Sequence, residues 1–311
     1  MSGIRIEGGR MREMKFGRRS LLSAAGMIVA GSVAACSAPQ PNRPPQPQPL
    51  PRPPMPPVVS HSGPPLVNVE TVYSENRGAD TSLVIAHPNG LQDTADLPMA
   101  LFLHGRDAMN PSPIPWGVLD ALQPEFDAGN IPPFGLVAVD GGFNSYWNDG
   151  SANGDLMSML LQEVPGWLRE RGLAGQDGLP FACGGVSTGG FGALNYAAER
   201  NMAGSPLAAV ATIAPALPVT WQHMQEKGVF ASEQEWIETD PLRRVDELGD
   251  VPVGIWIGEF DVFREGTDQL AQLYPNTPVY SVVPGGHEGP VFDSVGVDAV
   301  GFLAGGFPAE G

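Results

Sequence analysis

Eight short apolar runs, with helical patterns between the later ones, constrain the fold of this chain more than any other feature of its sequence. The runs are rich in Val, Leu, Ile and Phe and cover residues 67–73, 82–86, 98–104, 135–139, 181–186, 208–213, 253–257 and 279–283. Apolar side chains recur at spacings of three and four in residues 155–171, which predicts a helix, and 192–200, 268–274 and 290–303 are further helix candidates. This alternation predicts an α/β fold, with a mostly parallel central sheet and helices on both faces. Ligands of such sheets bind beyond the carboxyl ends of the strands, so the residues after each run are candidates for functional groups.

A single G-x-S-x-G pattern stands at residues 185–189, where the run 181–186 ends and a helical pattern begins. A serine on a sharp strand-to-helix turn is a nucleophile elbow, in which a strained backbone exposes the hydroxyl. Gly185 and Gly189 fit this turn, because a side chain at either position would collide with the neighbouring strand or helix. The pattern therefore predicts Ser187 as a catalytic nucleophile. Cys183, in the same run, is most simply a small buried strand residue.

A serine nucleophile needs a histidine that accepts its proton, and His287 is the best placed of the five histidines. Where this elbow occurs, the acid and then the histidine follow the serine in the chain. His287 lies on a glycine-rich loop between the last apolar run and the last helix candidate, whereas His223, the other histidine after the serine, lies in a helix-like insert. The remaining histidines are His61, His87 and His104. We therefore expect His287 to be the general base.

The acid that orients the histidine is expected between the serine and the histidine, also after a strand. Asp261 follows the run 253–257 and lies far enough from its end to reach across to His287. Glu259 on the same loop is the second candidate. Asp240, before a proline, is the third, although a turn or a helix cap explains it more simply.

Two backbone N–H groups are needed to hold the oxyanion that forms during acyl transfer. We expect one from Thr188, directly after the nucleophile, and the other from Arg106, on the loop after the run 98–104. His104, Asn144 and Trp147 lie where strands end and are candidates for substrate contact, although His104 is as well suited to hold the loop by a hydrogen bond.

Residues 215–248 are expected to complete the pocket. Four large apolar side chains in this segment could form a cap over the substrate, or could belong to the core, which is the commoner role of such side chains. They are Trp221, Met224, Phe230 and Trp236.

The first 36 residues have the pattern of a twin-arginine lipoprotein signal peptide. Arg18 and Arg19 precede the apolar run 21–35, which ends at Cys36, the expected site of lipidation. An ordinary secretory leader with an incidental cysteine is the alternative. Residues 37–65 are rich in proline and form the expected disordered linker, and residues 66–311 form the expected catalytic domain. These features predict an exported, extracytoplasmic protein with a lipid anchor in the membrane.

The charge of the chain disfavours nucleic acid as a partner. The formal net charge is −17, and the part after Cys36, with 11 basic and 32 acidic residues, carries −21. If Cys36 carries a lipid, Cys183 has no cysteine partner and no disulfide forms within the mature chain. The expected chemistry needs no metal and no cofactor.

Residues 101–303 resemble the esterase branch of the α/β-hydrolase superfamily that includes esterase D and the mycolyltransferases. The resemblance rests on residues 103–105 (Leu-His-Gly), 141–147 (Gly-Gly-Phe-Asn-Ser-Tyr-Trp), 162–165 (Gln-Glu-Val-Pro), the elbow, 240–241 (Asp-Pro), 258–261 and 286–287. It implies the α/β-hydrolase fold. It also implies a site with Ser187 as nucleophile, Asp261 as acid, His287 as base, and Arg106 and Thr188 as oxyanion donors.

Two departures from the mycolyltransferase pattern bear on the substrate. Asp107 stands where those enzymes typically have an arginine, and residues 288–289 (Glu-Gly) replace their Ser-Trp pair after the histidine. We therefore expect an exported serine carboxylic-ester hydrolase that works through an acyl-enzyme on a small-molecule, glycan or lipid ester. An acyltransferase of the mycolyltransferase type is the first alternative, and a non-catalytic envelope-binding module is the second. A peptidase is a weaker third, since the same triad cleaves amides.

Overall fold

The computed structural model describes residues 63–107 and 112–307, which belong to one compact unit. The expected leader with Cys36, and the expected linker up to residue 62, lie outside the described residues. Within the described ranges, no helix has the length and apolar character needed to cross a membrane.

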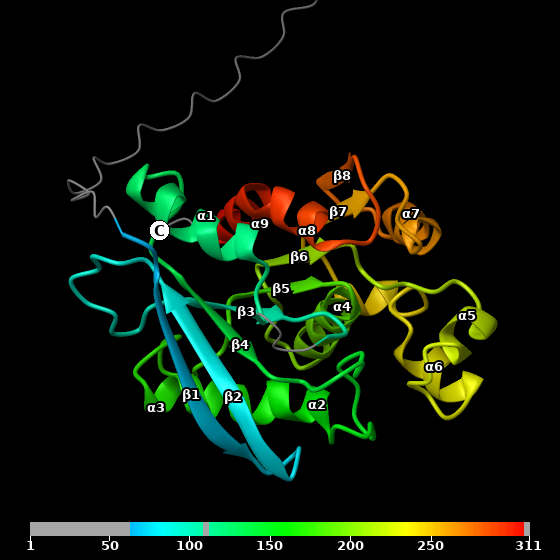
Figure 1. The fold of residues 1–311 in the computed structure, drawn as a ribbon. Coiled ribbons are helices and arrows are strands. Elements are labelled where there is room, and N and C mark those ends of the chain that lie inside the picture. The colour runs from blue at the N-terminus through cyan, green and yellow to red at the C-terminus, as the bar shows by residue number, and fades with distance from the viewer. Residues whose placement is uncertain (1–62, 108–111, 308–311) are drawn as a thin grey trace, which may run out of the picture. The chain divides into compact units, whose positions relative to one another are not determined.

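An eight-stranded sheet forms the centre of the described unit, in the order β1-β2-β4-β3-β5-β6-β7-β8 (Figure 1). β1 and β2 pair antiparallel, β2 and β4 pair antiparallel, and the strands from β4 to β8 run parallel. The strands are β1 (Leu66–Ser74), β2 (Ala79–His87), β3 (Met99–Leu103), β4 (Gly135–Val139), β5 (Ala182–Val186), β6 (Ala209–Ile213), β7 (Val253–Gly258) and β8 (Val279–Val283). All eight predicted runs are strands, and the prediction of a mostly parallel sheet is confirmed.

Helices cover both faces of this sheet. One face packs on α1 (Trp116–Asp127), α8 (Gly289–Ser294) and α9 (Gly296–Gly305), and the other packs on α2 (Leu156–Ser158), the π-helical turn Met159–Glu163, α3 (Val164–Glu170) and α4 (Thr188–Met202) (Figure 1). The remaining helical segments are α5 (Trp221–Gln225), α6 (Glu233–Thr239), the 3₁₀ turn Val245–Leu248 and α7 (Arg264–Leu273). Because β3 to β6 are covered on both faces, every residue in them is buried, which explains their continuous apolar sequence.

The helix predicted for residues 155–171 contains a π-helical turn that the sequence pattern did not reveal. Pro165 follows this turn and has no N–H to donate to a carbonyl in the preceding turn, so the regular α-helical pattern cannot continue unchanged. Glu163 ends the turn, and its carboxylate accepts hydrogen bonds from the hydroxyl of Ser74 at 2.5 Å and the N–H groups of Glu75 at 2.8 Å and Asn76 at 3.1 Å. The segment therefore fixes the turn between β1 and β2.

The helix predicted for residues 290–303 is divided at Val295 into α8 and α9. Gly296 lies where α9 meets α1, and a Cβ atom at this position would come within 2.0 Å of the backbone of Gly117. The two helices thus pack with their backbones almost in contact. α1 was not predicted from the sequence, because Pro113 and Pro115 precede it and Pro124 lies inside it.

Candidate active site

The backbone at Ser187 has the strained conformation of an elbow between β5 and α4. Its φ is +55° and its ψ is −118°, which non-glycine residues rarely adopt. A Cβ atom on Gly185 would lie 2.1 Å from the carbonyl oxygen of Gly189, and one on Gly189 would lie 2.0 Å from that of Leu103. Glycine is therefore required on both sides of the serine, as the pattern predicted.

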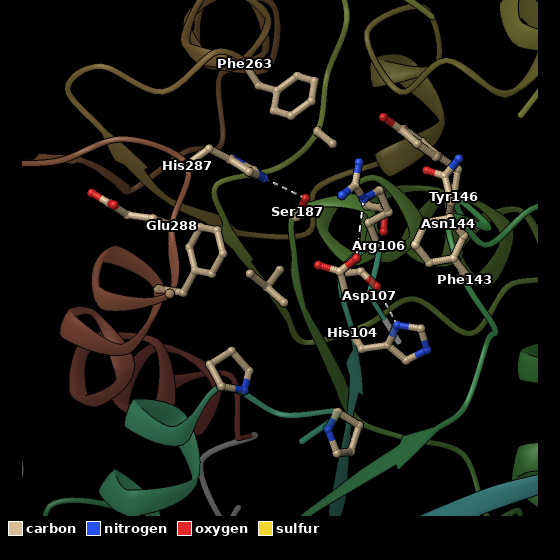
Figure 2. Close-up of a pocket in the computed structure, with 18 of the residues that line it drawn as sticks. His104, Arg106, Asp107, Phe143, Asn144, Tyr146, Ser187, Phe263, His287 and Glu288 are labelled. Carbon is tan, nitrogen blue, oxygen red and sulfur yellow. Dashed lines mark hydrogen bonds and ion pairs between the residues drawn. The ribbon is translucent and has the colours of Figure 1, made fainter. Parts of the chain in front are cut away.

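A continuous chain of hydrogen bonds joins the serine, the histidine and the aspartate (Figure 2). The Ser187 Oγ and His287 Nε2 atoms are 2.8 Å apart, and His287 Nδ1 lies 2.8 Å from Asp261 Oδ2. The Asp261 side chain is fully buried, and its other oxygen accepts the N–H of Phe263 at 2.8 Å. A carboxylate at Nδ1 favours the proton there, which leaves Nε2 to accept the serine proton.

Two aromatic rings hold the imidazole of His287. Phe263 and Phe292 meet it edge-on, with ring centroids 5.0 Å and 5.2 Å away. Together with the bond to Asp261, these contacts restrict the rotation of the ring, so that Nε2 stays directed at Ser187. Neither phenylalanine was singled out in the sequence, since nothing in the pattern shows which aromatic side chains meet a loop histidine.

The other two candidate acids lie away from the histidine. Glu259 is exposed, and the carboxylate of Asp240 accepts the N–H of Leu242 at 3.1 Å and lies 3.2 Å from Nε of Arg243. Neither carboxylate contacts His287 in the described part of the chain. The structure thus brings Asp261, of the three candidates, to the histidine.

The expected oxyanion donors lie on either side of the serine. Thr188 is the first residue of α4, so its N–H has no acceptor within the helix. The N–H of Arg106 has no acceptor within residues 63–107 and 112–307. A Cβ atom on Gly105 would lie 3.3 Å from Cβ of Ser187, which shows how closely this loop packs on the nucleophile. Both N–H groups are therefore available to a substrate oxygen.

His104 lines the cavity at the serine, and its ring has the loop-holding role that was the alternative to substrate contact. The residue is 2 % exposed, its Nδ1 lies 2.7 Å from the carbonyl oxygen of Gly105, and its Nε2 accepts the N–H of Gly141 at 2.8 Å. Both ring nitrogens are used within the protein, and burial lowers the pKa of the imidazole, which keeps it neutral. The proton must then be on Nδ1, which donates to Gly105.

The bond from His104 to the Gly105 carbonyl bears directly on the oxyanion donor. A peptide unit is planar and trans, so its carbonyl and its N–H point in opposite directions. The carbonyl of Gly105 and the N–H of Arg106 belong to the same unit. By holding that carbonyl, His104 sets the direction in which the Arg106 N–H points.

The structure does not place Trp147 where it could contact a substrate, because the residue is fully buried and does not line the cavity at the serine. Its indole N–H donates to the carbonyl oxygen of His104 at 3.1 Å, and its ring packs on the imidazole with centroids 4.7 Å apart. The φ of Trp147 is +61°, which turns the side chain into the core. Trp147 supports the loop of His104. Asn144, the third candidate, does line the cavity, where its side-chain amide donates to the carbonyl of Lys227 at 2.8 Å.

A cavity of about 860 Å³ opens at Ser187 and His287. Its apolar wall is formed by the start of α1 and by α8, and its polar wall by the loops after β3 and β4 and the segment after α5. The apolar wall includes Pro113, Ile114, Pro115, Trp116, Val186 and Phe292, and the polar wall includes Arg106, Asp107, Asn144, Tyr146, Glu226 and Lys227. An ester bound at the serine therefore meets different surroundings on its two sides.

The two departures from the mycolyltransferase pattern both lie on this cavity. Asp107 is 3.5 Å from Nε of Arg106, and Glu288 accepts the N–H of Gly286 at 3.3 Å. Each departure therefore places a carboxylate on the cavity.

The segment 215–248 contributes less to the cavity than expected. Three of its four large apolar side chains are buried in the core: those of Met224, Phe230 and Trp236. Glu226 and Lys227 line the cavity instead. Lys227 could have been noticed in the sequence, because it is the only lysine after the leader.

Of the comparisons with known proteins, the one with solved structures agrees with this architecture. A scan against protein-family models found no match, and no curated protein matches the chain. Among solved structures, a ferulic acid esterase is similar over 79% of this chain and 99% of its own, with 20% identity and a TM-score of 0.64. An S-formylglutathione hydrolase from Agrobacterium tumefaciens is similar over 78% of this chain and 95% of its own (15% identity, TM-score 0.59). A fluorophosphonate-binding serine hydrolase from Staphylococcus aureus covers 78% and 99% (16% identity, TM-score 0.56). With its mostly parallel sheet and its elbow after β5, the chain has the α/β-hydrolase fold.

Proposed function

We propose that this protein is a serine hydrolase that cleaves carboxylic esters of small molecules through an acyl-enzyme. The observation that carries the proposal is the hydrogen-bonded chain Ser187–His287–Asp261, with the serine on a strained elbow at the base of a cavity. A serine hydroxyl is a weak nucleophile unless a base takes its proton, and this geometry supplies such a base.

Each step of ester hydrolysis has a group in the chain that can perform it. His287 accepts the proton of Ser187 as the hydroxyl attacks the ester carbonyl, and Asp261 stabilises the imidazolium that results. The N–H groups of Thr188 and Arg106 stabilise the oxyanion. His287 then protonates the leaving alcohol and later activates the water that releases the acid.

The similar structures support the type of substrate. Their names describe a ferulic acid esterase and an S-formylglutathione hydrolase, both of which act on esters or thioesters by that description. The cavity of about 860 Å³ suits a small-molecule ester.

Labelling with a fluorophosphonate probe tests the proposal. The probe phosphonylates an activated serine, so we expect the folded wild-type protein to be labelled and the Ser187→Ala variant not to be. Ser281→Ala is a matched control, because Ser281 lies on β8 away from the cavity. Absence of labelling in the wild type, or equal labelling of Ser187→Ala, would rule out a serine hydrolase and would favour a non-catalytic binding module.

An acyltransferase is the second candidate function. The apolar and polar walls of the cavity are compatible with it, because one wall could hold the acyl group and the other an acceptor alcohol. Water and an alcohol compete for the same acyl-enzyme. Product analysis with and without added sugar or lipid alcohols separates the two activities. Formation of a new ester at the expense of free acid would identify a transferase.

We also propose that the protein is exported and held at the membrane by a lipid on Cys36, on the basis of the twin-arginine pattern and the small residues before this cysteine. In a bacterial host, the full chain is expected in the membrane fraction, and Cys36→Ala is expected to leave that fraction. If Cys36→Ala fractionates as the wild type does, the lipid anchor is wrong.

A further inference from the structure

The hydroxyl of Tyr146 lies on the polar wall of the cavity without a hydrogen-bond partner among the described residues. The side chain is 1 % exposed, and since Tyr146 lines the cavity, this small accessible part faces it. Among the described residues, the side-chain polar atoms that are both fully buried and without a partner belong to Asn148, Thr188 and Trp236, so the Tyr146 hydroxyl is not sealed in the core but open to the cavity that Tyr146 lines. A bound molecule is the natural partner for this hydroxyl.

The loop that carries Tyr146 is strained and firmly held. Asn144, Tyr146 and Trp147 have φ values of +52°, +52° and +61°, a left-handed conformation that is energetically costly for residues other than glycine. Asn144 ties the loop to two neighbouring segments, since its N–H donates to the carbonyl of Arg106 at 2.9 Å and its side chain donates to that of Lys227 at 2.8 Å. Strain of this kind is kept where the exact direction of side chains matters.

The ring of Tyr146 has little freedom to move. It packs edge-on against Phe191 and Phe230, with centroid distances of 5.1 Å and 6.3 Å. The hydroxyl is therefore fixed in place before any substrate arrives, which lowers the entropy cost of binding to it.

Two cationic donors share the polar wall with this hydroxyl, together with the carboxylates of Asp107 and Glu226. Burial raises the pKa of Tyr146, so the hydroxyl keeps its proton. The guanidinium of Arg106 and the ammonium of Lys227 line the same wall, and Lys227 lies over the ring of Phe263 at 5.2 Å. Figure 2 shows Arg106, Asn144 and Tyr146 gathered on one side of Ser187, with His287 and Glu288 on the other.

We propose that Tyr146 is a specificity-determining residue that donates a hydrogen bond to an acceptor oxygen on the substrate, remote from the ester bond that is cleaved. This inference rests on the proposed ester hydrolysis at Ser187. The acceptor can be a neutral ether or carbonyl oxygen or a carboxylate, because each of them can accept a hydrogen bond from the tyrosine hydroxyl. The nearby Asp107 pairs with Arg106, which leaves Tyr146 and Lys227 as the donors without an acidic partner among the described residues.

Esters with matched tails test this role on the full-length protein. The tails have equal length and end in a methyl group, a methoxy group or a carboxylate. One series carries the tail on the acyl part of 4-nitrophenyl esters, and the other on the alcohol part of acetate esters. The quantity measured is the ratio of kcat/KM for an oxygen-ended tail to that for the methyl-ended tail.

In at least one series, we expect the wild-type ratio to be about 10 or more and the Tyr146→Phe ratio to fall to about 1, the loss expected for one hydrogen bond to a buried donor. Tyr146→Met is a second variant that removes the hydroxyl, in case Tyr146→Phe does not fold. Tyr73→Phe is the matched control, because Tyr73 is 54% exposed on β1 and does not line the cavity. The methoxy and carboxylate arms distinguish a neutral acceptor from an anion.

A wild-type ratio near 1 in both series, or a ratio that Tyr146→Phe leaves unchanged, would overturn the role of Tyr146. Fluorophosphonate labelling is measured on the same samples. A wild type that is labelled but shows no preference contradicts only the role of Tyr146, whereas a wild type without labelling contradicts the proposed hydrolysis itself.

Discussion

His104 joins two loops of the site through its two ring nitrogens, one bonded to the Gly105 carbonyl and the other to the Gly141 N–H. It touches no reacting atom in the proposed mechanism. Its effect passes through the peptide unit that ends in the Arg106 N–H, which makes it a positioning residue for the oxyanion site.

Replacement of His104 by alanine is therefore expected to lower kcat by about 10- to 100-fold, less than the loss of a whole oxyanion donor, with a smaller change in KM. Steady-state kinetics with 4-nitrophenyl acetate measure both constants. His87→Ala is the control, because His87 lies on β2 and does not line the cavity. If KM rises while kcat is unchanged, His104 acts on ground-state binding and the positioning role is wrong.

Asp240 provides a prediction about stability and pH. Burial raises the pKa of this carboxyl from 3.8 to about 6, against the opposing effects of the Leu242 N–H and Arg243. The folded protein therefore holds this proton more tightly than the unfolded chain does. The contribution of this carboxyl to the free energy of unfolding is greatest below about pH 4. It falls by up to about 3 kcal/mol as the pH rises to about 6.

Asp240→Asn removes that dependence. Relative to the wild type, we expect the variant to gain in free energy of unfolding as the pH rises from 4 to 7, because the wild type alone must ionise a buried carboxyl. Urea unfolding at both pH values gives the difference. If the variant and the wild type differ in free energy of unfolding by the same amount at both pH values, Asp240 ionises as easily in the folded protein as in the unfolded chain.

The sequence located the residues whose role follows from their place after a strand. Ser187, Asp261 and His287 each lie beyond a parallel strand, and the shared direction of these strands brings them together. The inward orientation of Trp147 could not be predicted, because it depends on a φ of +61°. The same is true of Tyr146, which lines the cavity with a φ of +52°.

At the scale of elements, strands were predicted more reliably than helices. Strands buried on both faces need continuous apolar residues, which the sequence shows directly. Helix interruptions depend on contacts, such as the bonds from Glu163 to the turn after β1, and these involve residues about ninety positions apart. α1 was missed because its prolines are typical of loops in isolation.

The close packing at the elbow predicts that Gly189 cannot be replaced by alanine without a loss of stability. Gly189→Ala would place a Cβ atom 2.0 Å from the Leu103 carbonyl, so we expect a loss of about 3 kcal/mol in the free energy of unfolding and loss of activity. Gly166→Ala is the matched control, since Gly166 lies within α3 and a Cβ atom there meets nothing within 4 Å. That variant is expected to gain about 0.5–1 kcal/mol from helix propensity. Equal effects of the two substitutions, measured by urea unfolding, would contradict the close packing at the elbow.

At the scale of the whole molecule, the α/β class and the edge of the sheet that carries the site followed from the alternation of strands and helices. The walls of the cavity did not, because they come from segments far apart in the sequence that the sheet brings together. Lys227 and Phe263 belong to different segments, and only the fold shows that one lies over the other.

The proposed mechanism requires that Ser187 form a covalent acyl-enzyme. Rapid mixing of the full-length protein with 4-nitrophenyl acetate, followed by acid quench and peptide mass mapping, detects this intermediate. We expect an initial release of about one equivalent of 4-nitrophenol per enzyme and an acetyl group on Ser187. Turnover of the ester with no acetyl group on Ser187, or with the acetyl group on another residue, would contradict the claim.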